Sequence, residues 1–169
     1  TTAALTLGTT VDGAITQPRQ QNRYTFSLGA ASQLDFDSLT NDRSLGWSLV
    51  GPLGAKVSSR DFFNSDGGAF DTSLALNLVA GDYTLIVNGF GDHTGSYGFR
   101  LLDLASATSI TLGTPVNASL SPGNETDVYR FDAKAGDRFY FDQQSQSGGF
   151  VFWRLLDPYG RQVWFTFFG

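Results

Sequence analysis

The chain has 169 residues, of which 41% are hydrophobic, 14% aromatic and only 16% charged. Such a density of aromatic side chains excludes a disordered chain, and the scarcity of strong helix formers beside 20 glycines disfavours a helical fold. A net charge of −5 argues against a nucleic-acid partner, and the absence of cysteine excludes disulfides and thiol-bound metals. No apolar run is long enough to predict a membrane span.

Large apolar side chains alternate with polar ones in several short segments, which is the pattern of antiparallel strands with one buried face. In chain order these segments are 24–28, 34–37, 47–49, 74–78, 83–87 and 97–101. Glycine- and proline-rich turns separate them. The pattern predicts an all-β fold, an antiparallel β-sandwich of the jelly-roll kind, with these side chains in its core: Tyr24, Phe26, Phe36, Trp47, Leu49, Leu76, Leu85, Val87, Tyr97 and Phe99.

The sequence also repeats itself. Residues 5–11 return as 110–116, and Tyr24-Thr25-Phe26 returns as Tyr129-Arg130-Phe131, both 105 positions later. One inserted residue then raises the spacing to 106, at which Trp47 aligns with Trp153. The repeat predicts tandem units: residues 1–104 form a complete sandwich (unit one), and residues 105–169 form the first ~60% of a second, incomplete copy (unit two).

Unit two has no counterpart of residues 64–106, which hold the last three predicted strands of unit one. We therefore expect it to be completed by residues beyond 169 or by strands from a neighbouring molecule. The run at 163–168 is apolar on both faces. Its aromatic side chains are the predicted interface: Trp164, Phe165, Phe167 and Phe168.

The order of short motifs resembles that of the bacterial pre-peptidase C-terminal domain. The resemblance is carried by Leu-Gly-Thr-x-Val at 7–11, by Trp-x-Leu-x-Gly-Pro-x-Gly at 47–54, by Leu-x-Ala-Gly-Asp-Tyr-Thr-Leu-x-Val at 78–87 and by Gly-Ser-Tyr-x-Phe-Arg-Leu at 95–101. It implies a jelly-roll-like sandwich, secretion and a non-catalytic role. Some members of the family bind calcium or collagen, and others stand in tandem arrays of large surface proteins.

Few residues suggest catalysis. His93 is the only histidine and sits in a glycine-rich turn beside Asp92, without the nucleophile elbow of a hydrolase, so a plain turn residue is the simpler interpretation. One histidine and no cysteine leave too few ligands for zinc.

Calcium needs only oxygen ligands on loops. Two groups of side chains qualify, the first slightly favoured: Asp61, Asn64, Asp66 and Asp71, or Asp35, Asp37, Asn41 and Asp42. Within the second group only Asp37 recurs in unit two, as Asp142. Asp37 and Asp142 are therefore more simply outward strand residues that hydrogen-bond a neighbouring loop, and we expect no cofactor, and no calcium, to be required for folding.

The sequence favours a non-catalytic, extracellular β-sandwich repeat of a bacterial surface, matrix or filament protein, which acts in structure, adhesion and self-assembly. The tandem repeat and the lack of a catalytic motif carry this interpretation. The alternative is an accessory module of a secreted hydrolase or peptidase that grips polysaccharide or collagen. Such a module should present an exposed strip of aromatic side chains on one sheet.

Overall fold

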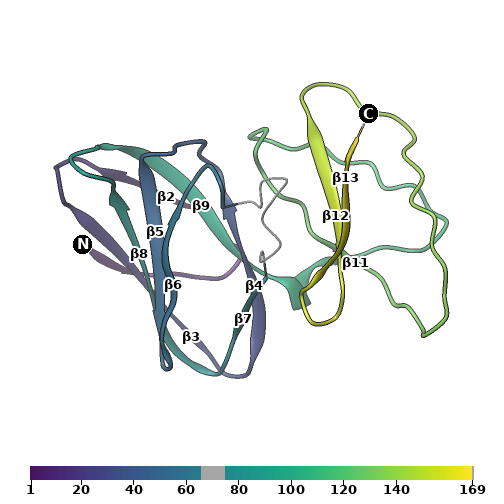
Figure 1. The fold of residues 1–169 in the computed structure, drawn as a ribbon, viewed down its shortest axis with the longest axis horizontal. Helices are drawn as coiled ribbons and strands as arrows, with labels where there is room; N and C mark the ends of the chain where they lie inside the picture. Colours follow the sequence, from purple (N-terminus) through teal and green to yellow (C-terminus); the bar gives the residue numbers. More distant parts are fainter. Residues whose placement is uncertain (66–74, 169) are drawn as a thin grey trace.

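Two β-sheets face each other across a shared core in unit one (Figure 1). The structure is a computed structural model, and it describes residues 1–65 and 75–168. The first sheet has the spatial order β1 (Thr2–Ala4), β3 (Gln21–Leu28), β8 (Gly81–Gly89), β5 (Leu45–Gly51) and β6 (Gly54–Asp61). The second has the order β2 (Val11–Ile15), β9 (Gly95–Asp103), β4 (Ser32–Ser38) and β7 (Leu76–Leu78). The predicted all-β sandwich is confirmed.

The core between these sheets is largely aromatic. All ten side chains predicted for it are buried, none more than 8% exposed. Phe36 of β4 stacks on Trp47 of β5 with ring centroids 4.1 Å apart, and on Phe99 of β9 at 5.0 Å. The indole Nε1 of Trp47 donates a hydrogen bond to the Ser65 hydroxyl at 2.6 Å, so that its polar atom is satisfied inside the core. Trp47 is thus a core residue, as its alternation with Leu49 predicts.

One pairing departs from the antiparallel prediction. The strand β1 runs parallel to β3, with Ala3 opposite Tyr24. It consists of three small, exposed residues, so no alternation of large side chains marks it in the sequence. The other pairings within the two sheets are antiparallel.

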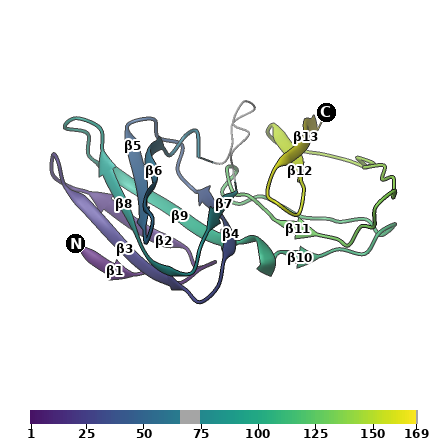
Figure 2. The same cartoon turned by 60° about the horizontal axis from the view of Figure 1, so that its bottom comes forward.

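A short 3₁₀ turn, η1 (Leu104–Ser106), leads from β9 into unit two. Unit two contains two separate two-stranded sheets, shown apart in Figure 2. One pairs β10 (Thr108–Ser109) with β11 (Tyr129–Arg130), and the other pairs β12 (Val151–Leu156) with β13 (Gln162–Phe168). Across residues 1–65 and 75–168 no helix is long and apolar enough to cross a lipid bilayer.

Unit two has no closed core. Its residues 105–168 contain no buried apolar side chain, and the buried cluster of the molecule lies entirely in unit one. Trp153 and Leu155, which the alternation places on a core face, are only half-buried, whereas their counterparts Trp47 and Leu49 are at most 1% exposed. In unit one this face is covered by the second sheet, where Phe36 of β4 stacks on Trp47, and β8 pairs with β5 along its edge.

Candidate functional site at the junction of the two units

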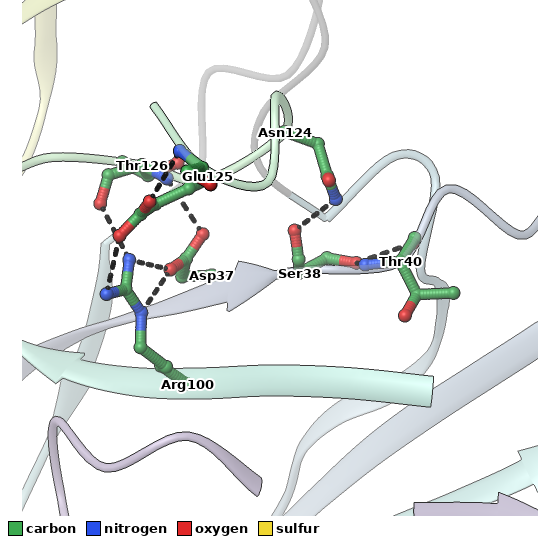
Figure 3. A network of polar contacts seen from close by, with 8 residues as sticks. Asp37, Ser38, Thr40, Arg100, Asn124, Glu125 and Thr126 are labelled. Atoms are coloured by element: carbon green, nitrogen blue, oxygen red, sulfur yellow. Dashed lines mark hydrogen bonds and ion pairs between the residues drawn. The ribbon is translucent and has the colours of Figure 1, made fainter. Parts of the chain in front are cut away.

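The outward faces of β4 and β9 carry a charged network that joins unit one to unit two (Figure 3). Asp37 and Arg100 lie directly opposite each other in the β4–β9 ladder. Arg100 donates from Nε to Oδ2 of Asp37 at 2.7 Å, and its Nη2 lies 2.5 Å from the same oxygen. Its Nη1 lies 2.8 Å from Oε1 of Glu125. One guanidinium therefore connects a strand carboxylate of unit one to a loop carboxylate of unit two.

Strand alternation explains why Asp37 can do this. Leu34 and Phe36 point into the sandwich core. Because successive side chains of a strand point to opposite faces, Asp35 and Asp37, which alternate with them, point outward. On that face Asp37 is covered by the loop at 124–126 instead of by water, and its side chain has no exposed surface.

Backbone contacts of the same loop complete the network. The Thr126 amide donates to Oδ1 of Asp37 at 3.0 Å, and the side chain of Asn124 donates to the Ser38 carbonyl at 2.6 Å. Arg100 also donates to the Thr126 carbonyl at 3.3 Å. Asp37 is thus an outward strand residue that hydrogen-bonds a neighbouring loop, as the sequence predicts. Asp142, by contrast, accepts a hydrogen bond from Gln144 in its own segment.

Burial and charge act in opposite directions on this pair. Burial raises the pKa of Asp37, although its hydrogen bond with Arg100 and the charge of Arg100 pull the pKa down. Burial also opposes the charge of Arg100, but the hydrogen bond and charge of Asp37 outweigh it and raise the pKa of Arg100. Removing one partner would leave the other charge unpaired in a site with little water. This lowers the free energy of unfolding more than replacing both partners with apolar residues would.

A second contact involves the turn between β12 and β13. Gln33 of β4 donates to the Pro158 carbonyl at 3.2 Å, and Asn77 of β7 donates to the Tyr159 carbonyl at 3.4 Å. The next residue, Gly160, is buried and has a φ of 77°, and a Cβ placed on it would lie 2.5 Å from that of Ala75. A side chain is excluded there both by the backbone conformation and by the close approach of unit one.

Asp35 is the least satisfied group at the junction. Its side chain is buried, and among the described residues its Oδ1 has no hydrogen-bond partner. Burial, with a smaller contribution from the charge of Asp37, raises the pKa of Asp35 to about 7, although the charges of Arg154 and Arg60 act against the rise. Arg154 belongs to β12, so this interaction also links the two units.

An open groove of about 610 Å³ lies beside the network, between β2, β9 and the loop at 121–125. Arg100 and Glu125 line it, but they are paired with each other. The groove is lined without histidine, so its side chains offer no nucleophile with a histidine base.

His93 has a partner that its sequence neighbours do not reveal. Its Nε2 lies 3.0 Å from Oδ2 of Asp42, and not beside the adjacent Asp92 carboxylate. Partial burial opposes the charge of Asp42, but hydrogen bonds from the Ser44 amide and from His93 lower the pKa of Asp42. His93 lies in the β8–β9 turn, as predicted, and there it ties this turn to the β4–β5 loop.

The two candidate calcium groups have different surroundings. In the group of Asp35, Asp37, Asn41 and Asp42, the Asp37 and Asp42 carboxylates contact Arg100 and His93, and Asn41 is exposed. In the other group, Asp61 accepts hydrogen bonds from the amide and side chain of Asn64, both at 2.8 Å, while Asp66 and Asp71 lie outside the described residues. Within residues 1–65 and 75–168 no three His, Cys, Asp or Glu side chains gather as metal ligands. Calcium binding stays a prediction.

The aromatic side chains predicted as an interface gather around the β12–β13 hairpin. Trp164 lies 5.4 Å from Trp153 and 5.1 Å from Phe141, measured between ring centroids, and Phe168 lies 4.5 Å from Trp153. Trp164, Phe165 and Phe168 are half-buried, and Phe167 is 51% exposed. Whether this cluster binds another chain stays a prediction.

Several junction residues carry no signal in the sequence that reveals their partners. Gln33 is an ordinary outward strand position, and Arg100 is part of the motif at 95–101, which does not indicate an ion pair. Asn124, Glu125 and Thr126 form a common glycosylation triplet. The one usable signal is the recurrence of Asp37 as Asp142, which marks an outward carboxylate shared by both units.

Comparisons with known proteins give a limited result. No protein-family model matches the chain, and no curated protein matches it. Among solved structures, the chain is similar to the pre-peptidase C-terminal domain of a collagenase from Bacillus anthracis, determined by crystallography at 1.0 Å. The sequence identity is 20% and the TM-score 0.46, and the match covers 60% of this chain and 94% of that one. That domain is of the type that the motifs of residues 1–104 resemble.

Proposed function

We propose that this chain is a non-catalytic, extracellular β-sandwich repeat of a bacterial surface, matrix or filament protein, and that it holds consecutive units in a fixed orientation. The observation that carries the proposal is the junction, where Asp37, Arg100 and Glu125 form a connected ion-pair network between the units. Such a buried network sets one geometry more effectively than a flexible linker would. Adhesion and self-assembly follow from the same kind of contact between neighbouring sandwiches.

The described surface of unit one lacks the feature expected of an accessory binding module. A carbohydrate-gripping face should show aromatic side chains in a row along one sheet. The exposed aromatic residues among the described part of residues 1–104 are Phe63 and Phe90, which lie in loops. Phe63 is covered by Arg43, whose guanidinium carbon is 3.6 Å from the ring centroid, and Phe90 lies against Gly46.

The test is whether the two units tumble as one body. We would measure ¹⁵N relaxation on the 169-residue chain, on the double variant Asn124→Ala/Glu125→Ala, and on Asn117→Ala as the matched control, since Asn117 is an exposed asparagine of the same unit. We expect one correlation time for the parent and the control. The double variant should give a shorter correlation time for residues 105–168, because the junction loop has lost its contacts.

Independent tumbling of the units in the parent chain would contradict the proposal. The alternative function has its own readout, which is binding of the chain to fibrillar collagen or to insoluble polysaccharide. Co-sedimentation with up to about 100 μM protein would detect a dissociation constant of that size, which corresponds to a binding free energy of roughly −5 kcal/mol. Saturable binding that persists in the double variant would favour the accessory binding module.

A further inference from the structure

Three outward side chains of β4 form a row beneath unit two: Gln33, Asp35 and Asp37. Unit two contacts both ends of this row. The Pro158 carbonyl accepts a hydrogen bond from Gln33, and the Thr126 amide donates one to Asp37. Asp35 therefore lies between two points at which unit two is fixed to unit one.

The carboxyl of Asp35 lacks the partners that satisfy its neighbour. Asp37 accepts hydrogen bonds from Arg100 and from the Thr126 amide. Asp35 is 8% exposed, its Oδ1 has no hydrogen-bond partner among the described residues, and the residue opposite it in β9 is the apolar Leu102. In such a site the ionised form of a carboxyl is disfavoured far more than the protonated form.

Charges near Asp35 act in both directions. Asp37 raises the pKa of Asp35, whereas Arg60 of β6 and Arg154 of β12, which also have other interactions, lower it. Burial has the largest effect and brings the pKa to about 7. The strand β7 carries no charged residue. The charged groups of β9, η1 and the loop at 124–126 already have partners: Arg100 and Glu125 pair with each other, and Asp103 accepts from the Ala105 amide.

Of the two carboxyls in the row, Asp35 is the one that takes a proton. Burial raises the pKa of Asp37 as well, but its hydrogen bonds with Arg100 and the Thr126 amide favour the charged form. Asp35 has no contact of this strength. The pair therefore holds one negative charge, on Asp37, when Asp35 is protonated.

Docking of unit two changes the surroundings of this row. Separation of the units would open the outward face of β4 to water, where a carboxyl has its ordinary pKa of 3.8. A carboxyl whose pKa is higher in the docked state favours docking most strongly below its ordinary pKa. This contribution is lost as the pH rises through the docked value of about 7.

We propose that docking of unit two on the outward face of β4 takes up one proton from solvent at Asp35, so that the junction closes in acidic surroundings and loosens toward neutral pH. The inference rests on the proposed role of the junction and adds its regulation. The only bond that forms is the O–H bond of the Asp35 carboxyl.

The first test follows the carboxyl carbon of Asp35 by ¹³C NMR from about pH 3 to pH 9, in the 169-residue chain with excess chelator. The variant Asn124→Ala/Glu125→Ala is the undocked reference. We expect a midpoint near 7 in the parent and near 4 in this variant. Equal midpoints would overturn the proposal, because the burial of Asp35 would then not depend on unit two.

The second test measures docking through the hydrogen-exchange protection factor of the Thr126 amide, which donates across the junction to Asp37. In the parent it should fall about 100-fold between pH 5 and pH 8. Asp35→Asn keeps the shape of the neutral carboxyl, so it should remove this fall and protect the amide at pH 8 as strongly as the parent does at pH 5. The control Asp92→Asn changes an exposed carboxyl in the β8–β9 turn and should keep the fall.

A protection factor that does not depend on pH in the parent would overturn the proposal, as would a fall that persists in Asp35→Asn. Should that variant not fold, the carboxyl titration of the unaltered chain gives the answer. The proposed function has a separate readout. Independent tumbling of the units at every pH would contradict the junction itself, whereas joint tumbling with an Asp35 midpoint near 4 would contradict only the uptake of a proton.

Discussion

Replacing Arg100 by methionine tests the junction most directly. Arg100→Met keeps much of the side-chain length but removes the charge that lies 2.5 Å from the Asp37 carboxylate. The side chain of Asp37 has no exposed surface, and Arg100 is 19% exposed. Breaking a buried ion pair by removing one partner costs about 3–5 kcal/mol, and the partial exposure of Arg100 favours the lower end. We therefore expect the free energy of unfolding of unit one to fall by about 3 kcal/mol at pH 8.

The assay is urea unfolding followed by tryptophan emission, in a background where Trp153 and Trp164 are phenylalanine so that the buried Trp47 alone reports. The control is Arg23→Met, an exposed arginine of β3, which should change stability by less than about 0.5 kcal/mol. A loss below about 1 kcal/mol for Arg100→Met, where a buried pair predicts more, would refute the reasoning.

A double variant separates the loss of attraction from the cost of an unpaired charge. In Asp37→Leu/Arg100→Met the fully buried carboxylate is removed together with its partner, and the Glu125 carboxylate, 16% exposed, loses Arg100 in both variants, so the double variant should be more stable than Arg100→Met alone. If instead the two substitutions were additive, Asp37 would not be the group that makes the single substitution costly.

Three further predictions concern the junction and the loops. Asp35 binds its proton more tightly in the folded chain, with a pKa of about 7 against 3.8, so its contribution to stability falls as pH rises from about 4 to about 7. Asp35→Asn should flatten this part of the curve of unfolding free energy against pH, and an unchanged slope would contradict the assignment. Gly160→Ala should increase proteolysis between the units, because its Cβ would meet Ala75, and it should leave the melting temperature of unit one unchanged. Gly54 holds the same turn position in unit one, with open space around it. Gly54→Ala should therefore lower the melting temperature of unit one through its φ of 92° alone. Excess chelator should not change the thermal melting temperature, and millimolar calcium should not raise it by several degrees. A calcium site saturated at 100 times its dissociation constant would instead add about 2.7 kcal/mol to the free energy of unfolding, and such a rise would contradict the prediction.

The sequence predicts the parts of this fold that depend on local alternation. Phe36, Trp47 and Phe99 lie on the inward side of period-two segments, and each is at most 1% exposed. Alternation also places Asp37 on the outward face, and its recurrence as Asp142 indicates a hydrogen-bonding role, which Thr126 fulfils for Asp37.

The remaining features depend on contacts between distant segments. Arg100 is one of several outward strand residues, and only the folded chain brings Glu125 to it, from a loop without any periodicity. The partner of His93 is likewise 51 positions away, although Asp92 is its sequence neighbour. Charge pairing across loops has no period, so pattern analysis cannot assign it.

The parallel pairing of β1 with β3 has a mechanical consequence. Figure 2 shows β1 running from the N-terminus toward unit two, alongside β3. At its two ends the Arg23 amide donates to the Thr1 carbonyl and the Leu5 amide donates to the Thr25 carbonyl, both at 2.8 Å. A pull on the N-terminus directed away from unit two would shear these bonds together, instead of peeling them apart one at a time. Because β10 and β11 repeat the arrangement, traction along a tandem chain would meet the same shear contact at the entry strand of each unit.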